Sequence, residues 1–441
     1  MNTIFLKNTI IIFLLFFSYS LLNGQVSNTY KTAILEGDSY FLYEEYSDAL
    51  PGYLILNKEM PENYNIQYKI GVCFLNLEFE KQQALQYLER ASKHINMEYR
   101  DHWKETKAPI EVLFELGNAY RVNNKLDEAI DAYNRFLEVV DSTVHDIQLV
   151  NDRVNSCQIA KKLINQPIEM EMINLGSTVN TSFNDKRPVI NQQEDMIVFI
   201  SELHFYDAIF YSRKENGKWI TPLNMMPELG VDNDAYPVCL SSDSKELYVY
   251  RKDNYDGNIY VTKYSEGKWT PLEKLNGNIN TKYWESHASL SKDGKTLYFT
   301  SNRPGGYGGL DIYISTRPNK ETNEWDEPIN LGAIINSRYN EETPFVTSDN
   351  NHLYFSSEGH YNMGGYDIFY SVKDSLLGKW SNPVNIGYPI NTTGDELFFY
   401  PMSNGSHGYF SFYDPFSTFG KTDIYKINIL SKNQKKHSSV Q

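Results

Sequence analysis

Residues 291–313 read SKDGKTLYFTSNRPGGYGGLDIY, and residues 348–369 read SDNNHLYFSSEGHYNMGGYDIF. Both stretches place a short run of aromatic and aliphatic residues before a glycine-containing segment, and both end on Asp-Ile-aromatic. Short aromatic and β-branched runs separated by Gly, Asn, Asp and Pro are strand and turn signals. The two stretches therefore predict the same unit, in which two strands are joined by a loop.

The unit recurs throughout the second half of the chain. Its first run reads DMIVFIS, ELYVYR, TLYFTS, HLYFSS and, more loosely, GYFSF, and its Asp-Ile-Tyr-like element begins at Asp207, Gly257, Asp311, Asp367 and Asp423. The first four copies also carry a Trp shortly before a Pro, at Trp219, Trp269, Trp325 and Trp380. Five units of about 50 residues with four strands each predict a five-bladed all-β propeller over residues 168–430.

The segment Ile168–Gly176, IEMEMINLG, precedes the first copy of the unit, whereas the last copy lacks its Trp-containing strand. The end of this segment matches the INLG that follows Pro328. We expect the segment to supply the missing outer strand of the fifth blade. Such an exchange would close the ring without exposed sheet edges.

The first half of the chain carries a helical repeat with a period near 34 residues. Small residues, which close helix crossings require, recur with aromatic residues that fill the space beside them. The key positions are Gly37, Tyr40 and Ala49, then Gly71, then Gly117, Tyr120 and Ala129. This pattern resembles the tetratricopeptide repeat over residues 30–142, which implies an all-α solenoid of three helix pairs.

An amphipathic stretch at about residues 145–164 is expected to cap the last open face of this array. We assign residues 27–165 to the helical domain, so the chain is predicted to be multidomain, all-α and then all-β. Stacked helix pairs leave a concave groove that commonly takes an extended peptide or a partner helix. The alternative is that the array only spaces or orients the propeller.

The two ends of the chain are assigned outside these domains. Lys7, the apolar run Ile10–Leu22 and the break that follows predict a signal peptide over residues 1–24. The alternative is a retained N-terminal anchor. The polar, basic tail at residues 431–441 is expected to be disordered. The protein is therefore expected to be exported.

Composition and charge narrow the possible functions. A net charge of −15 disfavours nucleic acid and anionic lipid, so protein partners are expected. Cys73, Cys157 and Cys239 are scattered and are expected to be buried small residues rather than a disulfide framework or a metal set. The nine His show no metal spacing, and His287, on an inner strand, has no His equivalent in other blades. We predict no metal site, no cofactor and no enzymatic activity.

Residues that recur blade by blade are predicted to build the scaffold. Gly would allow positive φ in the turn before the strand, and each recurring Asp would accept hydrogen bonds from that turn. The glycine-rich loop lacks the Lys-Ser/Thr ending and the following helix of a phosphate loop. The positions assigned to the scaffold are Gly305, Gly306, Gly308, Gly309, Asp311, Gly364, Gly365, Asp367, Asp423, Trp219, Trp269, Trp325 and Trp380.

One symmetric set of residues is a candidate binding site. Each innermost strand opens with an acidic residue, and propeller geometry would place all five at one mouth of the central channel. Five carboxylates there would favour a cation or a basic segment of a partner. The alternative is that each carboxylate caps its own loop. The five residues are Asp185, Asp234, Glu285, Glu341 and Asp395.

The propeller units resemble the PD40 repeat, a WD40-like repeat of TolB-type propellers, most clearly at residues 291–313 and 348–369. Tetratricopeptide repeats followed by PD40 units resemble OmpA-family envelope proteins of Bacteroidota, among them an accessory protein of type IX secretion. This resemblance covers residues 27–430 and implies a periplasmic, outer-membrane-associated protein with protein partners in the cell envelope. Those relatives continue into a peptidoglycan-binding domain that has no counterpart here, so direct peptidoglycan binding is not expected.

The leading hypothesis is a non-enzymatic scaffold that acts in envelope organisation or type IX secretion. A first alternative is a glycan-binding or hydrolytic propeller that stacks sugars on aromatic residues at the channel mouth. Exposed aromatic residues beside a pair of carboxylates would favour it. A second alternative is a structural spacer, which would have no stable partner.

Overall fold

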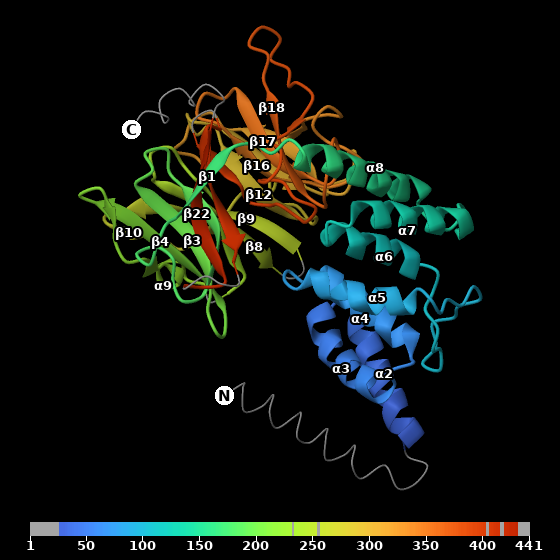
Figure 1. The fold of residues 1–441 in the computed structure, drawn as a ribbon. Helices are drawn as coiled ribbons and strands as arrows, with labels where there is room; N and C mark the ends of the chain where they lie inside the picture. The colour runs from blue at the N-terminus through green and yellow to red at the C-terminus, as the bar shows by residue number, and fades with distance from the viewer. Residues whose placement is uncertain (1–25, 232, 254–255, 403–404, 415–418, 431–441) are drawn as a thin grey trace, which may run out of the picture. The chain divides into compact units, whose positions relative to one another are not determined.

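The computed structural model describes residues 26–231, 233–253, 256–402, 405–414 and 419–430 (Figure 1). The predicted signal peptide and the predicted disordered tail lie outside the described residues. The chain divides into two compact units, one helical and one built of sheets, with the boundary between Lys161 and Lys162. Among the described helices, none is long and apolar enough to cross a membrane.

The helical unit contains the three predicted helix pairs and the predicted capping helix. Within each pair the two helices pack against one another in the order α2/α3, α4/α5 and α6/α7, and α8 follows. The bounds are α2 Val26–Leu42, α3 Tyr46–Glu59, α4 Tyr64–Asn76, α5 Ala84–Ala91, α6 Val112–Val122, α7 Leu126–Val139 and α8 Ile147–Ile164, with a short 3-10 turn, η1 Lys81–Gln83, before α5.

The repeated glycines stand where the helices of a pair cross. A Cβ at Gly117 would lie 2.4 Å from the ring of Tyr133, and a Cβ at Gly71 would lie 2.4 Å from Leu88. A Cβ at Gly37 would lie 2.9 Å from the ring of Tyr53. No side chain larger than hydrogen fits these crossings, because protein interiors have no slack of that size. The first helix of each pair therefore needs glycine at this position.

The other repeat positions are less uniform. Ala49 and Ala129 are fully buried at their helix crossings, as expected. Tyr120 is partly buried, and its hydroxyl donates to Glu89 Oε1 at 3.0 Å. Tyr40 was expected to fill space beside its small neighbours, but this prediction is wrong, because its side chain is 37% exposed. Phe41 packs on Tyr53 in its place, with ring centroids 6.2 Å apart.

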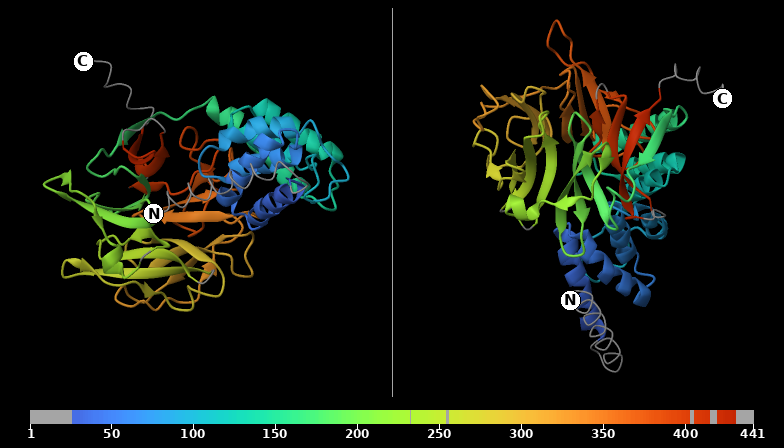
Figure 2. Two further views of the ribbon diagram at one scale, coloured as in Figure 1. Left: turned by 90° about the horizontal axis from the view of Figure 1, so that it is seen from below. Right: turned by 90° about the vertical axis from the view of Figure 1, so that its left-hand side faces the viewer.

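The sheet unit is a propeller of five antiparallel blades, as predicted (Figures 1 and 2). The first four blades run outward from their first strand. Their strands are β2 Asn184–Ile190, β3 Met196–Glu202, β4 Asp207–Glu215, β5 Lys218–Trp219 and β6 Leu223–Asn224; β7 Ala235–Leu240, β8 Glu246–Asp253, β9 Asp256–Ser265, β10 Lys268–Trp269 and β11 Glu273–Lys274; β12 Glu285–Leu290, β13 Thr296–Ser301, β14 Asp311–Thr316 and β15 Ile329–Asn330; and β16 Glu341–Val346, β17 His352–Ser357, β18 Asp367–Val372 and β19 Val384–Asn385. A short helix, α9 Met226–Leu229, lies between the first two blades in sequence.

The fifth blade joins the two ends of the propeller. Its strands β20 (Tyr400–Met402), β21 (His407–Tyr413) and β22 (Thr422–Ile429) are completed by β1 (Met170–Asn174), which pairs antiparallel with β22. The register runs from Met170 opposite Ile429 to Asn174 opposite Tyr425. The predicted closing strand is therefore confirmed, and the last blade lies beside the first (Figure 2).

The four repeated Trp pack near the outer edges of the first four blades. Trp269 and Trp325 are buried, and Trp219 and Trp380 are partly buried. Three of them have a cation over the ring, with Lys214 4.8 Å from Trp219, Arg317 4.8 Å from Trp325 and Lys373 5.5 Å from Trp380. Such contacts anchor the ends of the outer strands. The three cysteines are free and buried, as expected.

Two of the repeated Asp residues accept hydrogen bonds from their loops, as expected. Asp311 accepts from the backbone N–H groups of Tyr307 and Gly308 at 2.6 and 3.0 Å. Asp367 accepts from the N–H of Met363 at 2.7 Å. Asp423 accepts at 3.0 Å from the side chain of Asn174, which lies on the closing strand.

The repeated glycines have a different role from the one predicted. Gly305 does have a positive φ of 93°, but the other loop glycines do not. A Cβ at Gly308 would lie 2.0 Å from the carbonyl oxygen of Tyr339, and one at Gly364 would lie 2.5 Å from that of Gly394. Glycine is required because the loop entering the next blade passes in backbone contact. Gly306, Gly309 and Gly365 meet side chains instead. A Cβ at Gly306 would lie against the carboxylate of Asp311 in the same blade, and Cβ atoms at Gly309 and Gly365 would lie against the side chains of Asn340 and Asp395.

Candidate binding site in the propeller channel

Three of the five predicted acidic residues open an inner strand, and all three are buried. Each accepts hydrogen bonds from the backbone N–H and the hydroxyl of the residue four positions earlier. The pairs are Asp185 with Thr181, Glu285 with Thr281 and Glu341 with Ser337, at 2.5 to 3.0 Å. These carboxylates therefore cap their own loops, which is the alternative to a recognition ring.

The other two predicted acids are offset by one residue. Ala235, not Asp234, pairs with Arg251 at the register where Glu285 pairs with Ser301. In the fifth blade the loop-capping acid is Glu396, which accepts from the N–H of Thr392 at 2.8 Å. A shift of one residue moves a side chain to the other face of a strand. Asp234 and Asp395 are accordingly exposed.

Asp395 instead takes the place of an asparagine in the fourth blade. It accepts a hydrogen bond from the N–H of Tyr366 at 3.2 Å, as Asn340 accepts one from Leu310 at 2.9 Å. The five predicted residues thus hold two kinds of position and form no single ring.

Burial also weakens the negative charge that such a ring would carry. Desolvation raises the pKa of Asp185 and that of Glu341 to about 7. It raises the pKa of Glu396 well above its usual value, and the nearby Asp367 adds to the shift. Capping, rather than attraction of a cation, is what these side chains do in the fold.

The inner strands share a feature that sequence reasoning missed. In each of the first four blades the pairing register of the inner strand shifts after its first residues, at a β-bulge. Four residues near this level have a left-handed backbone, and they are Arg187 (φ 53°), His287 (φ 35°), Thr343 (φ 50°) and Phe398 (φ 63°). Such backbone is costly for residues other than glycine and concentrates at sites where a side chain is re-aimed.

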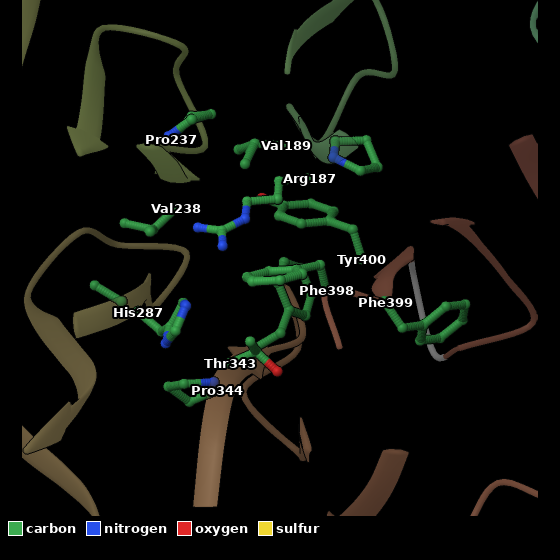
Figure 3. Close-up of a pocket in the computed structure, with 13 residues that line it drawn as sticks. Arg187, Val189, Pro237, Val238, His287, Thr343, Pro344, Phe398, Phe399 and Tyr400 are labelled. Carbon is green, nitrogen blue, oxygen red and sulfur yellow. The ribbon is translucent and has the colours of Figure 1, made fainter. Parts of the chain in front are cut away.

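The re-aimed side chains line a hollow in the channel, which we call the channel hollow (Figure 3). It encloses about 380 Å³, open solvent included, and all five inner strands contribute to its wall. Arg187 lies between two aromatic rings, 4.6 Å from the centroid of Tyr236 and 4.3 Å from that of Phe398. The hollow therefore combines a fixed positive charge with apolar walls.

A second polar group on the wall is His287, which is 9% exposed. Its Nδ1 lies 3.1 Å from Glu342 Oε2, and the hydroxyl of Tyr366 donates to Glu342 Oε1 at 2.8 Å. Burial alone would raise the pKa of Glu342, but His287, Tyr366 and the charge of Arg187 hold it below its usual value. Glu342 is therefore an ionised carboxylate that orients the His287 ring.

His287 Nε2 is buried and has no hydrogen-bond partner among the described residues. Buried polar groups are nearly always paired, and among the described residues that line the channel hollow only His287 has such an unpaired side-chain atom. The sequence contained one signal for it, because the repeat breaks at the bulge positions, where the residues are Arg, His, Thr and Phe. In the part of the chain that is described, no group of three His, Cys, Asp or Glu side chains could hold a metal ion.

The deeper end of the channel hollow is closed by aromatic rings. Phe345 and Tyr400 meet edge to face, with ring centroids 4.3 Å apart. Both also line a second hollow of about 510 Å³, open solvent included, which Cys239 and Met402 help to line. The ring pair thus separates the two hollows within the channel.

One face of the propeller carries exposed aromatic side chains. The loops between second and third strands, at residues 203–206, 302–310 and 358–366, lie on the face where the inner strands begin, and we call this the entry face. Phe205 is 73% exposed, Tyr307 54% and Tyr361 45%. Aromatic residues that protrude from several blades on one face are typical of a contact surface.

The first helices of the first two pairs are contacted by a connecting segment of the chain itself. Residues 92–111, which connect α5 to α6, lie against α2 and α4. Lys69 on α4 binds Asp101 of this segment at 3.2 Å and Asp38 on α2 at 2.6 Å, and Lys31 on α2 lies over Trp103. The chain's own segment therefore packs on the first helices of the first two pairs.

A comparison with known protein families agrees with the helical part of this description. A family model described as tetratricopeptide repeat matches residues 111–140, which include α6 and α7. No curated protein sequence matches the chain.

Solved structures to which the chain is similar include TolB from Acinetobacter baumannii, at 17% identity and a TM-score of 0.33, over 57% of this chain and 55% of that one. This chain thus spans just over half the length of that relative. A putative TolB from Agrobacterium tumefaciens matches at 15% identity and a TM-score of 0.36, over 59% of this chain and 90% of that one. An α-L-arabinofuranosidase from Podospora anserina, solved with cellotriose, matches at 12% identity and a TM-score of 0.39. The match covers 60% of this chain and 98% of that one. Similarity this low says nothing about activity, and the strand pairing itself defines the propeller.

Proposed function

We propose that this chain is an exported, non-enzymatic scaffold that binds protein partners in the bacterial cell envelope. Its location would be the periplasm, in association with the outer membrane, and its context envelope organisation or type IX secretion. The location and the context rest on the resemblance described above.

The observation that carries the proposal is the set of exposed aromatic residues on the entry face, Phe205, Tyr307 and Tyr361. Aromatic residues are enriched in protein interfaces because each buries a large area at a small cost in side-chain entropy. The helical array supports the proposal less directly than we expected, because residues 92–111 cover α2 and α4. We therefore assign partner binding chiefly to the propeller.

The test is crosslinking in native envelopes followed by identification of the captured proteins. The variant Phe205→Ser/Tyr307→Ser/Tyr361→Ser is expected to lose the envelope proteins that the wild type captures. Its matched control is Leu376→Ser/Leu377→Ser, on the loop between β18 and β19 at the opposite face, where Leu376 is 93% exposed. Capture of metabolic enzymes alone, or loss only in the control, would contradict the proposal, and capture of nothing would favour the spacer alternative.

A glycan-binding propeller is the second candidate, because exposed aromatic rings also stack on sugars. The predicted acids Asp185, Glu285 and Glu341 do not form a carboxylate pair beside these rings, because each is buried in its own loop. A glycan array distinguishes the candidates. Binding that disappears in Tyr307→Ser would favour the glycan role, and an empty array together with captured envelope proteins would favour the scaffold.

A further inference from the structure

The channel hollow has a chemistry that the fold alone does not require. Its bulge residues differ from blade to blade, whereas the residues that build the scaffold recur. The repeat does not require these residue types, and yet the residues hold a costly left-handed backbone, which suggests that they serve a function of this site rather than the fold. The two members of this set that can carry a charge, Arg187 and His287, both line the hollow.

We propose that the channel hollow is a binding site for a carboxylate-bearing ligand, whose charged oxygens are received by Arg187 and His287. This inference goes beyond the scaffold role and concerns the propeller alone. It holds whether or not an envelope partner binds the entry face.

The charge of the site favours an anion. Arg187 is always protonated, and stacking against Tyr236 and Phe398 uses the faces of its guanidinium, whereas its N–H bonds point along the plane. A cationic ligand would be repelled by this group. A planar carboxylate fits the guanidinium fork.

His287 supplies the second contact. Glu342 accepts from Nδ1 and fixes the orientation of the ring, which leaves Nε2 buried without a partner among the described residues. A ring that carries a proton on each nitrogen donates Nδ1–H to Glu342 and Nε2–H to a ligand oxygen, and this second bond would satisfy the buried atom.

The walls favour a carbon skeleton over a bare inorganic anion. Pro188, Pro237, Pro344 and Phe398 line the hollow beside the charged group. These surfaces gain nothing from contact with a fully hydrated phosphate, but they bury the methylene groups of an organic acid favourably. The carboxylate could belong to a small organic acid or to the C-terminus of a peptide.

The first experiment compares matched acids and amides by saturation-transfer NMR on the full mature chain. Butyrate is expected to bind and butyramide to bind about ten- to hundredfold more weakly, which is the range for loss of a charge-assisted pair. An acetylated trialanine with a free C-terminus, compared with its C-terminal amide, shows whether the site prefers the carboxylate of a peptide C-terminus or that of a small organic acid. Tighter binding of the peptide acid than of butyrate assigns the site to a chain end, and the reverse assigns it to a small acid.

Variants then test the residues. Arg187→Met and His287→Phe keep the apolar bulk of each side chain, and each is expected to weaken butyrate binding about tenfold or more. The control Arg213→Met, at an exposed position on β4, removes the same charge elsewhere and should leave binding within about twofold. The folded state of each variant is checked by its thermal transition.

Equal binding of butyrate and butyramide to the wild type would overturn the proposal, and this comparison does not depend on the folding of any variant. Tighter binding of inorganic phosphate than of butyrate would overturn the assignment to carboxylates. Unchanged butyrate binding in a folded Arg187→Met protein would remove the site from the hollow.

Discussion

The side-chain amide of Asn174 donates a hydrogen bond to Asp423 Oδ2 at 3.0 Å, although 249 residues separate the two in the sequence. Asn330 and Asp311 make the same contact within the third blade, at 2.8 Å. The closing strand β1 thus reproduces in the fifth blade a bond that the other blades form locally. Ring closure is specific in its side chains as well as in its strand pairing.

Replacing Asn174 with Ala should destabilise the propeller by about 1–2 kcal/mol, because the closing bond to Asp423 is lost together with the bonds that Asn174 Oδ1 accepts from Gly176 and Asn180. The control is Asn428→Ala on the neighbouring strand β22, where an exposed bond to Glu171 is removed. Its effect should stay below about 0.5 kcal/mol. Urea unfolding followed by Trp fluorescence measures both, and equal effects would show that the closing bond is not specific.

The helix crossings make a second prediction. Gly117→Ala places a methyl group 2.4 Å from Tyr133 and should cost about 1–3 kcal/mol by overpacking. Gly52→Ala, in the interior of α3 with nothing within 4 Å of the new methyl, should instead stabilise by about 0.5–1 kcal/mol. Thermal unfolding followed by circular dichroism compares them. Higher thermal stability in both variants would mean that the helix crossing at Gly117 can relax to accommodate the methyl group.

Burial of Asp185 predicts a pH dependence. Desolvation raises its folded pKa to about 7, so the folded state holds a proton that the unfolded state releases near pH 4. The stability from this carboxyl is fully present below about pH 4 and is lost as pH rises through about 7, by about 4 kcal/mol at most.

The measurement is the difference in free energy of unfolding between the wild type and Asp185→Asn, from pH 4 to pH 8. The advantage of the wild type should shrink as pH rises. The exposed Asp234→Asn serves as the control and should change stability by less than about 0.5 kcal/mol. An advantage that grows with pH would mean that Asp185 is ionised in the fold.

A buried ion pair connects the second and third blades. Arg317 Nη2 lies 2.7 Å from Glu246 Oε2, and the Arg317 side chain is fully buried. Arg317→Met should cost about 3–5 kcal/mol, because an unpaired carboxylate remains in the interior. Adding Glu246→Gln should recover at least about half of this loss, since the stranded charge is removed. Additive losses in the double variant would contradict the pairing.

The sequence allowed the architecture to be predicted because both halves repeat. Gly37, Gly71 and Gly117 mark the helix crossings, and the INLG motif in Ile168–Gly176 identified the closing strand before any pairing was known. Because the copies of a repeat can be compared with one another, positions at which the same residue type recurs are recognised as structural requirements, whereas residues that vary between copies are not. Scaffold positions are therefore the ones that a single sequence exposes best.

The binding site could not be predicted in the same way. The bulges in the inner strands shift the register, so Asp234 was aligned with Glu285 although Ala235 holds that position. His287 was considered only as a metal ligand, because its contact with Glu342 joins two different blades and depends on backbone angles. The segment at residues 92–111 covers α2 through tertiary contacts that no local pattern encodes.

The central claim, that the entry face of the propeller binds a protein partner, is tested most directly by site-specific photo-crosslinking in living cells. A photoreactive amino acid would be placed at Phe205 or Tyr307 on the entry face and, for comparison, at Leu376 on the opposite face. We predict a discrete crosslinked envelope protein from Phe205 and Tyr307 and none from Leu376. Crosslinks from Leu376 alone, or from none of the three positions, would contradict the claim.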